Sequence, residues 1–373
     1  MTTTYTNGRI FDGIRLHDGM AIQIKDGVFA GMIPQQDATN GIDLAGDILS
    51  LGYVDLQVNG GDGIMFNDDP STATLTRIAQ AHRRLGVTRI LPTLITDTVE
   101  KTRAAIEATI HRRDVGIAGL HLEGPHLSLA RKGAHDAKYI RPMDNDDLQM
   151  LLDAKTQLPI LKVTIAPENV SVGQVTTLTK AGVLVSLGHT DADYDTCMTY
   201  ARAGARCTTH LFNAMSQFSN RAPGLVGATM DCGTLSAGLI ADGVHVHPAA
   251  MRMAWTAKTK PGQIFLVSDA MAVAGTDATS FTLDGRRITR KDGQLRLSDG
   301  TLAGADLNLT TAISVLVNQV GVELESALAA ATTIPAKLEG ISTYGLEKNV
   351  TPQTDLVRIN RDLSTAMPLV TTS

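Results

Sequence analysis

The feature that most constrains the fold is a regular alternation of strand-like and helix-like segments from about residue 50 onward. The helix-like stretches repeat apolar residues at 3.6 spacing, as in Leu75, Ile78, His82 and Leu85, after which Gly86 can end the helix. Such alternation predicts a parallel sheet. About eight units favour a TIM (β/α)8 barrel over an open sheet. The expected strands, several rich in Val, Ile and Leu, are 51–58, 88–94, 117–123, 161–167, 183–189, 206–212, 236–242 and 264–270.

The two ends of the chain have a different sequence pattern from the middle. Short apolar runs within residues 1–51 are separated by Asp-Gly pairs, which indicate hairpins and a small β-rich module. The strand-like tail, residues 354–370, could pair with that module. Three further Asp-Gly pairs predict hairpins inserted near 280–302, after the last barrel strand. We therefore expect a barrel over 52–344 and a small domain built from 1–51 and 345–373.

Composition excludes several classes of protein. A net charge of −5 argues against a nucleic-acid-binding surface, which requires basic residues. No run of about 18 apolar residues predicts a membrane span, and the first residues do not resemble a signal peptide. Three cysteines without Cys-x-x-Cys spacing predict no disulfide framework. A cytoplasmic location is the expectation.

Polar side chains stand where the predicted strands end. Because the carboxyl ends of barrel strands converge on one face, where TIM-barrel active sites lie, these residues are expected to meet. Their separations, such as 66 residues from Glu123 to His189 and 21 from His189 to His210, correspond to about two and about one βα unit. The set comprises Gln57, Asn59, Glu123, His189, His210, Asp242, His245 and Asp269.

Two imidazoles and one carboxylate form a ligand set that suits Zn²⁺ or Fe²⁺ and leaves a position open for water. A bound metal ion lowers the pKa of water toward about 7. Asp269 could take the proton of that water and pass it to a leaving amine. Any one of these histidines alone is more often structural than a ligand. The placement of Glu123, His189, His210 and Asp269 together favours a metal-dependent hydrolase.

Other polar residues are weaker candidates. His17, His82 and His111 are expected on the surface or on helices. His121 shares a strand face with Glu123, so it could support the ligands of the site or pack in the barrel, and packing is the preferred interpretation. Lys162 could be a carbamylated metal-bridging lysine, but it lies near the start of its strand, away from the expected site.

Seven longer motifs contain the candidate residues. The motifs are GYVDLQVNGGDG (52–63), HLEGPHLSLARKGAH (121–135), SLGHTDAD (186–193), THLFNAMSQFSNRAPGLVGA (209–228), LIADGVHVHP (239–248), LVSDAM (266–271) and TLAGADL (301–307). Together they resemble the N-acetylglucosamine-6-phosphate deacetylase family of the amidohydrolase superfamily. The match runs from about Gly52 to Leu338, in the order and at the spacing of the family.

The resemblance implies a TIM barrel with a small β-sandwich domain made from both termini. It also implies hydrolysis of the acetamide of N-acetylglucosamine 6-phosphate to glucosamine 6-phosphate and acetate. Glu123, His189 and His210 match the metal ligands, Asp269 the catalytic aspartate, and His135 the histidine that polarises the acetyl carbonyl. Residues that match substrate contacts are Ala134, Asn213, Ala214, Arg221, His245, Leu302, Ala303 and Gly304. The counterpart of Arg221 reaches the neighbouring subunit's site, which implies a homodimer.

Two departures from the family pattern matter. Many amidohydrolases carry His-x-His at the end of the first strand, where this chain has Gln57 and Asn59. Neutral amides are poor ligands for Zn²⁺ or Fe²⁺ beside imidazole, so we expect one metal ion, with Gln57 and Asn59 marking a vestigial second position. A second, weakly bound metal ion is the alternative. The family usually has Arg-Glu-Pro-Gly where this chain has Arg221-Ala222-Pro223-Gly224, which retains the arginine.

Three alternatives remain at this point. The substrate could be N-acetylgalactosamine 6-phosphate, which differs in the orientation of one hydroxyl group. A cyclic-amide hydrolase such as a dihydroorotase is disfavoured by the missing His-x-His. A non-catalytic sugar-phosphate sensor would not require the acid/base residue Asp269 or a full set of metal ligands.

Overall fold

The computed structural model describes residues 1–112, 116–283 and 285–370. Asp284, one residue of an expected hairpin turn, lies outside the described residues, as do the last three positions of the expected 345–373 segment. No helix among the described residues is long and apolar enough to cross a membrane.

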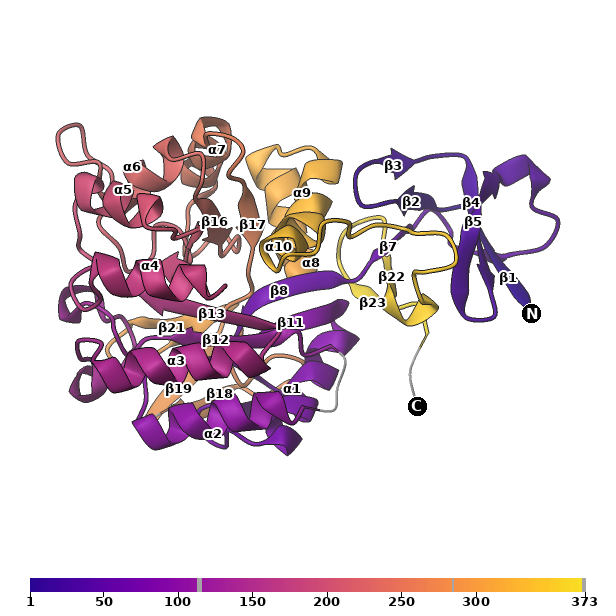
Figure 1. Ribbon diagram of the computed structural model, residues 1–373. Coiled ribbons are helices and arrows are strands. Elements are labelled where there is room, and N and C mark those ends of the chain that lie inside the picture. Colours follow the sequence, from indigo (N-terminus) through magenta and orange to yellow (C-terminus); the bar gives the residue numbers. More distant parts are fainter. Residues whose placement is uncertain (113–115, 284, 371–373) are drawn as a thin grey trace.

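Within the described residues, eight parallel strands form the barrel (Figure 1), and each expected strand is found at its place. Neighbouring strands follow chain order, and an isolated bridge between Val58 and Ala270 joins the last strand's end to the first strand. The TIM-barrel prediction is therefore confirmed. The strands are β8 (Tyr53–Val58), β11 (Val87–Ile95), β12 (Gly119–Glu123), β13 (Ile160–Ile165), β14 (Leu184–Leu187), β15 (Cys207–Thr208), β16 (Ser236–Leu239) and β17 (Ile264–Leu266).

Helices pack around the outside of the strands (Figure 1). Several begin at a side chain that accepts the backbone N–H three residues on, which satisfies one of the free donors of the first turn. Gly86 follows α1 at a φ of 85°, as its helix-ending role requires. The helices between strands are α1 (Thr72–Arg84), α2 (Val99–Ile110), α3 (Asn145–Gln157), α4 (Val172–Lys180), α5 (Tyr194–Arg202), α6 (Gly224–Asp231) and α7 (Pro248–Ala257).

The helical region that follows β21 consists of several short segments. It begins at Leu309, where Asn308 caps the first turn, and it becomes a π-helix at Leu316. Its elements are α8 (Leu309–Val315), η4 (Leu316–Val320), α9 (Leu324–Ala331) and α10 (Thr333–Leu338). Short 3-10 turns lie at η1 (Gln35–Asp37), η2 (Leu129–Arg131), η3 (Ala137–Tyr139) and η5 (Gln353–Asp355).

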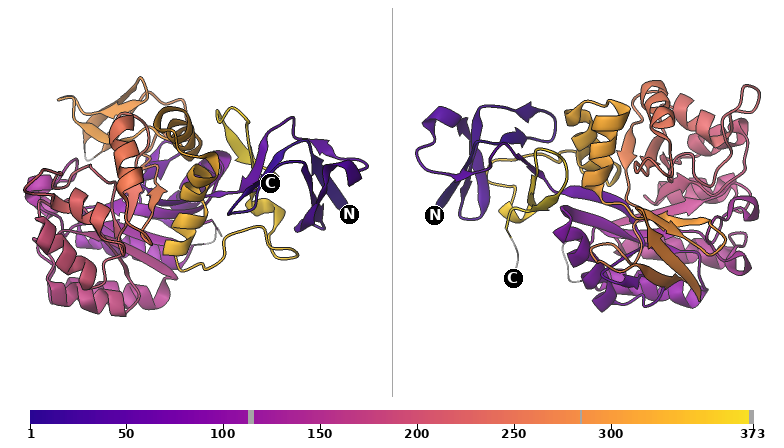
Figure 2. Two further views of the ribbon diagram at one scale, coloured as in Figure 1. Left: turned by 90° about the horizontal axis from the view of Figure 1, so that it is seen from above. Right: turned by 180° about the vertical axis from the view of Figure 1, so that it is seen from behind.

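The Asp-Gly-rich segment after β17 forms an antiparallel sheet of four described strands: β18 (Ser280–Leu283), β19 (Arg286–Lys291), β20 (Gln294–Arg296) and β21 (Leu302–Ala305). A bridge between Ala305 and Ala270 attaches this sheet to the barrel close to Asp269. Figure 2 shows it lying against one side of the barrel. Two short strands, β9 (Gly60–Gly61) and β10 (Ile64–Met65), follow β8.

Two further sheets make up the small β domain beside the barrel (Figures 1 and 2). The tail strand β22 pairs antiparallel with β7, so the two chain ends share one sheet, and Ile22, Leu49 and Leu356 meet in its core. The strands are β1 (Thr2–Thr6), β2 (Arg9–Phe11), β3 (Leu16–His17), β4 (Met20–Lys25), β5 (Val28–Pro34), β6 (Ile42–Asp43), β7 (Ile48–Leu51), β22 (Leu356–Ile359) and β23 (Ala366–Pro368). The domain boundaries at 51/52 and 344/345 remain predictions.

Candidate metal centre

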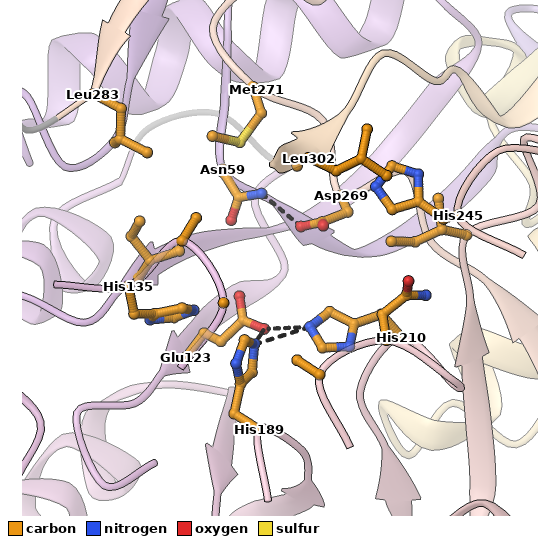
Figure 3. Close-up of a pocket in the computed structure, with 17 residues that line it drawn as sticks. Asn59, Glu123, His135, His189, His210, His245, Asp269, Met271, Leu283 and Leu302 are labelled. Atoms are coloured by element: carbon orange, nitrogen blue, oxygen red, sulfur yellow. Dashed lines mark hydrogen bonds and ion pairs between the residues drawn. The ribbon is translucent and has the colours of Figure 1, made fainter. Parts of the chain in front are cut away.

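Glu123, His189 and His210 converge at the carboxyl ends of β12, β14 and β15 (Figure 3). Their ligand atoms lie within 4.8 Å of one another, and all three residues are buried. Glu123 Oε1 is 3.3 Å from His189 Nε2 and 3.2 Å from His210 Nε2. Strand ends that lie far apart in the sequence thus bring together the three residues expected to bind metal.

The chemistry of this group fits a divalent cation. The Nε2 atoms of His189 and His210 are 3.0 Å apart. His189 Nδ1 donates to the carbonyl oxygen of Arg131 at 2.9 Å, which in the neutral ring leaves Nε2 as a lone pair facing its neighbours. Nitrogen and oxygen lone pairs this close repel unless a positive charge lies between them. Two imidazoles and a carboxylate are a donor set that binds Zn²⁺ or Fe²⁺.

The electrostatics of Glu123 agree with this arrangement. Burial disfavours a charged carboxylate, but the two imidazoles beside it outweigh that effect and hold the pKa of Glu123 well below its usual range. The Glu123 charge in turn raises the pKa of His210 against the effect of burial. Glu123 is therefore an anion at neutral pH, as a metal ligand must be.

Asp269, just beyond β17, faces the group from the opposite side of the cavity (Figure 3). Its Oδ1 accepts the amide of Asn59 at 2.7 Å and that of Gln57 at 3.1 Å. The Gln57 amide also lies 3.2 Å from both carboxylate oxygens of Glu123. Burial, followed by the Glu123 charge, raises the pKa of Asp269, which suits a group that takes up and releases a proton.

His135 lies at the edge of the same cavity, with its ring 4.4 Å from that of His189. The backbone N–H of Thr96 donates to His135 Nδ1 at 3.3 Å, and Thr96 Oγ1 lies 2.8 Å from the same nitrogen. Burial, followed by the charge of His189, lowers the pKa of His135 to about 3, so the ring is neutral. With Nδ1 as acceptor, Nε2 carries the proton and can donate to a carbonyl oxygen.

A cavity of about 190 Å³ joins these groups. Most residues predicted to form the site line it: Asn59, Glu123, Ala134, His135, His189, His210, Asn213, Ala214, His245, Asp269, Leu302 and Gly304. His245 is held by Asp242, whose Oδ2 lies 2.6 Å from its Nδ1. Three predicted residues do not line the cavity. Gln57 is fully buried beside it, Ala303 packs into an apolar cluster on β21, and Arg221 is exposed on the loop before α6.

The cavity also has lining residues that the sequence analysis missed. They are Ile95, Gly133, Ile240, Met271 and Leu283. All but Gly133 are apolar, and an apolar residue at a strand end looks like any other core residue. Two of these residues could have been predicted from the motifs: Gly133 stands beside Ala134, and Met271 belongs to LVSDAM.

The structure places two of the weaker candidates in buried hydrogen-bonded positions. His82 lies on α1, as expected, on its buried face, where its Nε2 bonds to the carbonyl oxygen of Gly60 at 2.9 Å. His121 is buried, and its two ring nitrogens lie 3.1 Å from Thr93 Oγ1 and 2.7 Å from Thr164 Oγ1. Lys162 is buried within the barrel and donates to the carbonyl oxygen of Leu56 at 3.3 Å.

Comparison with known proteins agrees with this geometry. An N-acetylgalactosamine-6-phosphate deacetylase of Shewanella sp. is 38% identical over 330 residues, covering 86% of this chain and 83% of the relative. An N-acetylglucosamine-6-phosphate deacetylase of Haemophilus influenzae is 35% identical, covering 86% of this chain and 85% of the relative. The crystal structure of N-acetylglucosamine-6-phosphate deacetylase from Pasteurella multocida has a TM-score of 0.90 at 32% identity, covering 98% of this chain and 97% of that one.

Residues 48–348 match the model of the amidohydrolase family. The match spans the barrel and includes every strand end that contributes to the candidate metal centre. The family is metal-dependent, in agreement with the buried Glu123, His189 and His210 group. The chain belongs to the amidohydrolase family.

Proposed function

We propose that this protein hydrolyses the acetamide of N-acetylglucosamine 6-phosphate to glucosamine 6-phosphate and acetate. The observation that carries the proposal is a single cavity that holds a metal-binding triad, a buried carboxylate and a neutral histidine donor. The names and similarity of the relatives support the substrate class.

We propose one divalent cation per chain, most simply Zn²⁺ with Fe²⁺ as the other candidate, held by Glu123, His189 and His210. A cation there would supply Lewis-acid chemistry that activates water and polarises a carbonyl group. The amide nitrogens of Gln57 and Asn59 donate to the carboxylates of Glu123 and Asp269. Neutral amide oxygens are poor ligands for Zn²⁺ or Fe²⁺ beside imidazole, which supports a single metal ion per chain.

Asp269 is the proposed acid/base. Its position across the cavity from the triad supports removal of a proton from the attacking water and delivery of that proton to the leaving amine. His135 is the proposed donor to the acetyl oxygen through its Nε2–H, where negative charge develops during attack. The contact with Thr96 keeps that proton on the nitrogen that the cavity can use.

The remaining cavity residues are proposed to hold the sugar phosphate. Ala134, Asn213, Ala214, Leu302 and Gly304 line the space available to it, and His245 is oriented by Asp242. Ala303 is proposed to act through its backbone. Arg221 is exposed, and we propose that it completes the phosphate site of a second subunit in a homodimer. The cytoplasmic location remains a prediction.

N-acetylgalactosamine 6-phosphate is the second candidate substrate, because a relative of 38% identity carries that name. Parallel measurements of kcat/KM on the two sugar phosphates would decide between them. A preference for the gluco epimer is expected. A strong preference for the galacto epimer would replace the proposed substrate and leave the proposed mechanism intact.

The experiment that tests the whole proposal is metal analysis of the purified protein together with an acetate-release assay. About one metal ion per chain is expected. Glu123→Gln should abolish both metal binding and acetate release. Glu339→Gln is the matched control, because Glu339 is also a buried carboxylate but pairs with Arg89 away from the cavity. A Glu123→Gln variant that keeps full activity would contradict the proposal.

A further inference from the structure

The barrel closes at a seam unlike its other strand junctions. Seven neighbouring pairs, from β8–β11 to β16–β17, share a parallel ladder. At the closing junction, the described residues show an isolated bridge between Val58 and Ala270, beyond the end of β17. Backbone hydrogen bonds from Asp269 to Gln57 and from Asn59 and Gly60 to Ala270 hold this segment against the end of β8, in place of a parallel ladder.

A buried carboxylate lies at this seam. Both carboxylate oxygens of Asp55 are 3.2 Å from the backbone N–H nitrogen of Ser268, and Oδ1 also accepts the N–H of Gln57 at 3.1 Å. Asp55 is 0% exposed and lies in the middle of β8, two residues before Gln57 on the same strand face. It thereby satisfies a backbone donor on each side of the seam.

Burying a carboxylate away from water costs free energy, so a buried Asp55 is expected to have a structural or functional role. Burial raises the pKa of Asp55 to about 7, against the hydrogen bonds that it accepts. Lys162 is buried in the same barrel interior, and its positive charge interacts with Asp55. An apolar residue at position 55 would leave the N–H groups of Ser268 and Gln57 without this acceptor.

The two residues that Asp55 holds both bear on Asp269. Ser268 directly precedes it, and the Gln57 backbone carbonyl accepts the N–H of Asp269 at 3.1 Å. The Gln57 side chain reaches the Asp269 carboxylate. Asp269 itself has a φ of 49°, a left-handed backbone that an aspartate adopts at some cost and that its surroundings must maintain.

We propose that Asp55 is a positioning residue, which fixes Gln57 and Ser268 across the barrel seam and so holds the Asp269 carboxylate in its working geometry. This inference rests on the proposed role of Asp269 as the acid/base. Asp55 does not line the cavity, so it acts on the reaction through Asp269 rather than by touching substrate.

The test is Asp55→Asn, an isosteric change that leaves one good acceptor oxygen for the two N–H groups. In folded, metal-loaded protein, we expect kcat for acetate release to fall by about 10- to 100-fold, with KM and metal content close to wild type. Tyr53→Phe is the matched control, since it removes the buried contact of Tyr53 with Thr310, 3.2 Å long, from the same strand. Its kcat per folded chain should stay within about twofold of wild type.

A second comparison separates positioning from a general structural role. If Asp55 acts through Asp269, the Asp55→Asn/Asp269→Asn double variant should turn over within about threefold of Asp269→Asn alone. An Asp55→Asn variant with the kcat of Tyr53→Phe, or a double variant with fully additive losses, would overturn the inference. If Asp55→Asn does not fold, Asp55→Ser takes its place, and failure of both to fold would assign Asp55 to folding alone.

The outcome also separates this inference from the proposed function. A silent Asp55→Asn beside an inactive Asp269→Asn would remove the positioning role and leave the mechanism intact. An active Asp269→Asn would refute the mechanism itself.

Discussion

The barrel rim and the terminal β domain both contain non-glycine residues with left-handed backbone, but of different kinds. In the terminal domain these residues are Asn7, Asp26, Ala45, Asn349 and Leu363. Three of the five are Asn or Asp, which tolerate this conformation because their short polar side chains can bond locally. At the rim, the residues are His189, His210, Phe212, Ala214 and Asp269.

This difference shows where the fold stores strain. Left-handed backbone costs free energy in a residue other than glycine, and it persists only when surrounding contacts impose it. Two proposed metal ligands and the proposed acid/base are all in this state, directly after their strands end. Substitutions at the left-handed positions of the terminal domain are therefore expected to be tolerated. Substitutions at the left-handed positions of the barrel rim are expected to lower activity.

The largest effect is expected from Asp269→Asn. An amide cannot accept the proton from water, so kcat should fall by about a thousandfold or more, while metal content is retained. Metal analysis and acetate release on the same preparation would check this. Turnover near the wild-type level would show that the rim's strained aspartate has no acid/base role.

A smaller loss is expected from His135→Phe, which keeps an aromatic ring in place but removes the Nε2–H donor. By analogy with removal of one oxyanion donor, kcat should fall by about 100- to 1000-fold. The variant should still bind metal, because His135 is not in the triad. If kcat is unchanged while KM rises, His135 contributes to substrate binding alone.

Removal of metal by a chelator should lower stability mainly at the rim. A bound ion at about 100 times its dissociation constant contributes about 2.7 kcal/mol, and this should disappear with the ion. Thermal unfolding with and without chelator measures the shift, and re-addition of Zn²⁺ should reverse it. In the Glu123→Gln variant, the chelator should have no effect on the melting temperature.

The smallest effect is expected from Asn349→Gly in the terminal domain. Asn349 is exposed at a φ of 62°, so glycine fits its backbone and the free energy of unfolding should change by about 0.5 kcal/mol or less. The kcat should not change. Asn349→Val, which strains a β-branched residue in the same turn, should cost about 1–2 kcal/mol and provides the contrast. Equal effects of the two variants would remove the backbone explanation.

The positions of His82 and His121 show what pattern alone could not determine. Strand or helix periodicity assigns a residue to a face but not to its partners. His82 lies on the buried face of α1, where the chain after β8 presents the Gly60 carbonyl to it. His121 is hydrogen-bonded because the neighbouring strands β11 and β13 carry Thr93 and Thr164 within reach of its ring.

The sequence by itself determined the order of strands and helices, the strand ends that carry Glu123, His189, His210 and Asp269, and the residue types that suit a metal ion. These follow from local periodicity and from the common direction of parallel strands. Only the tertiary structure decided which ring nitrogen of His135 carries the proton, that Arg221 does not line the cavity of its own chain, and that Asp55 bridges the seam. Those features depend on atoms that closure of the barrel brings together, such as Asp55 and Ser268, which are 213 residues apart in the chain.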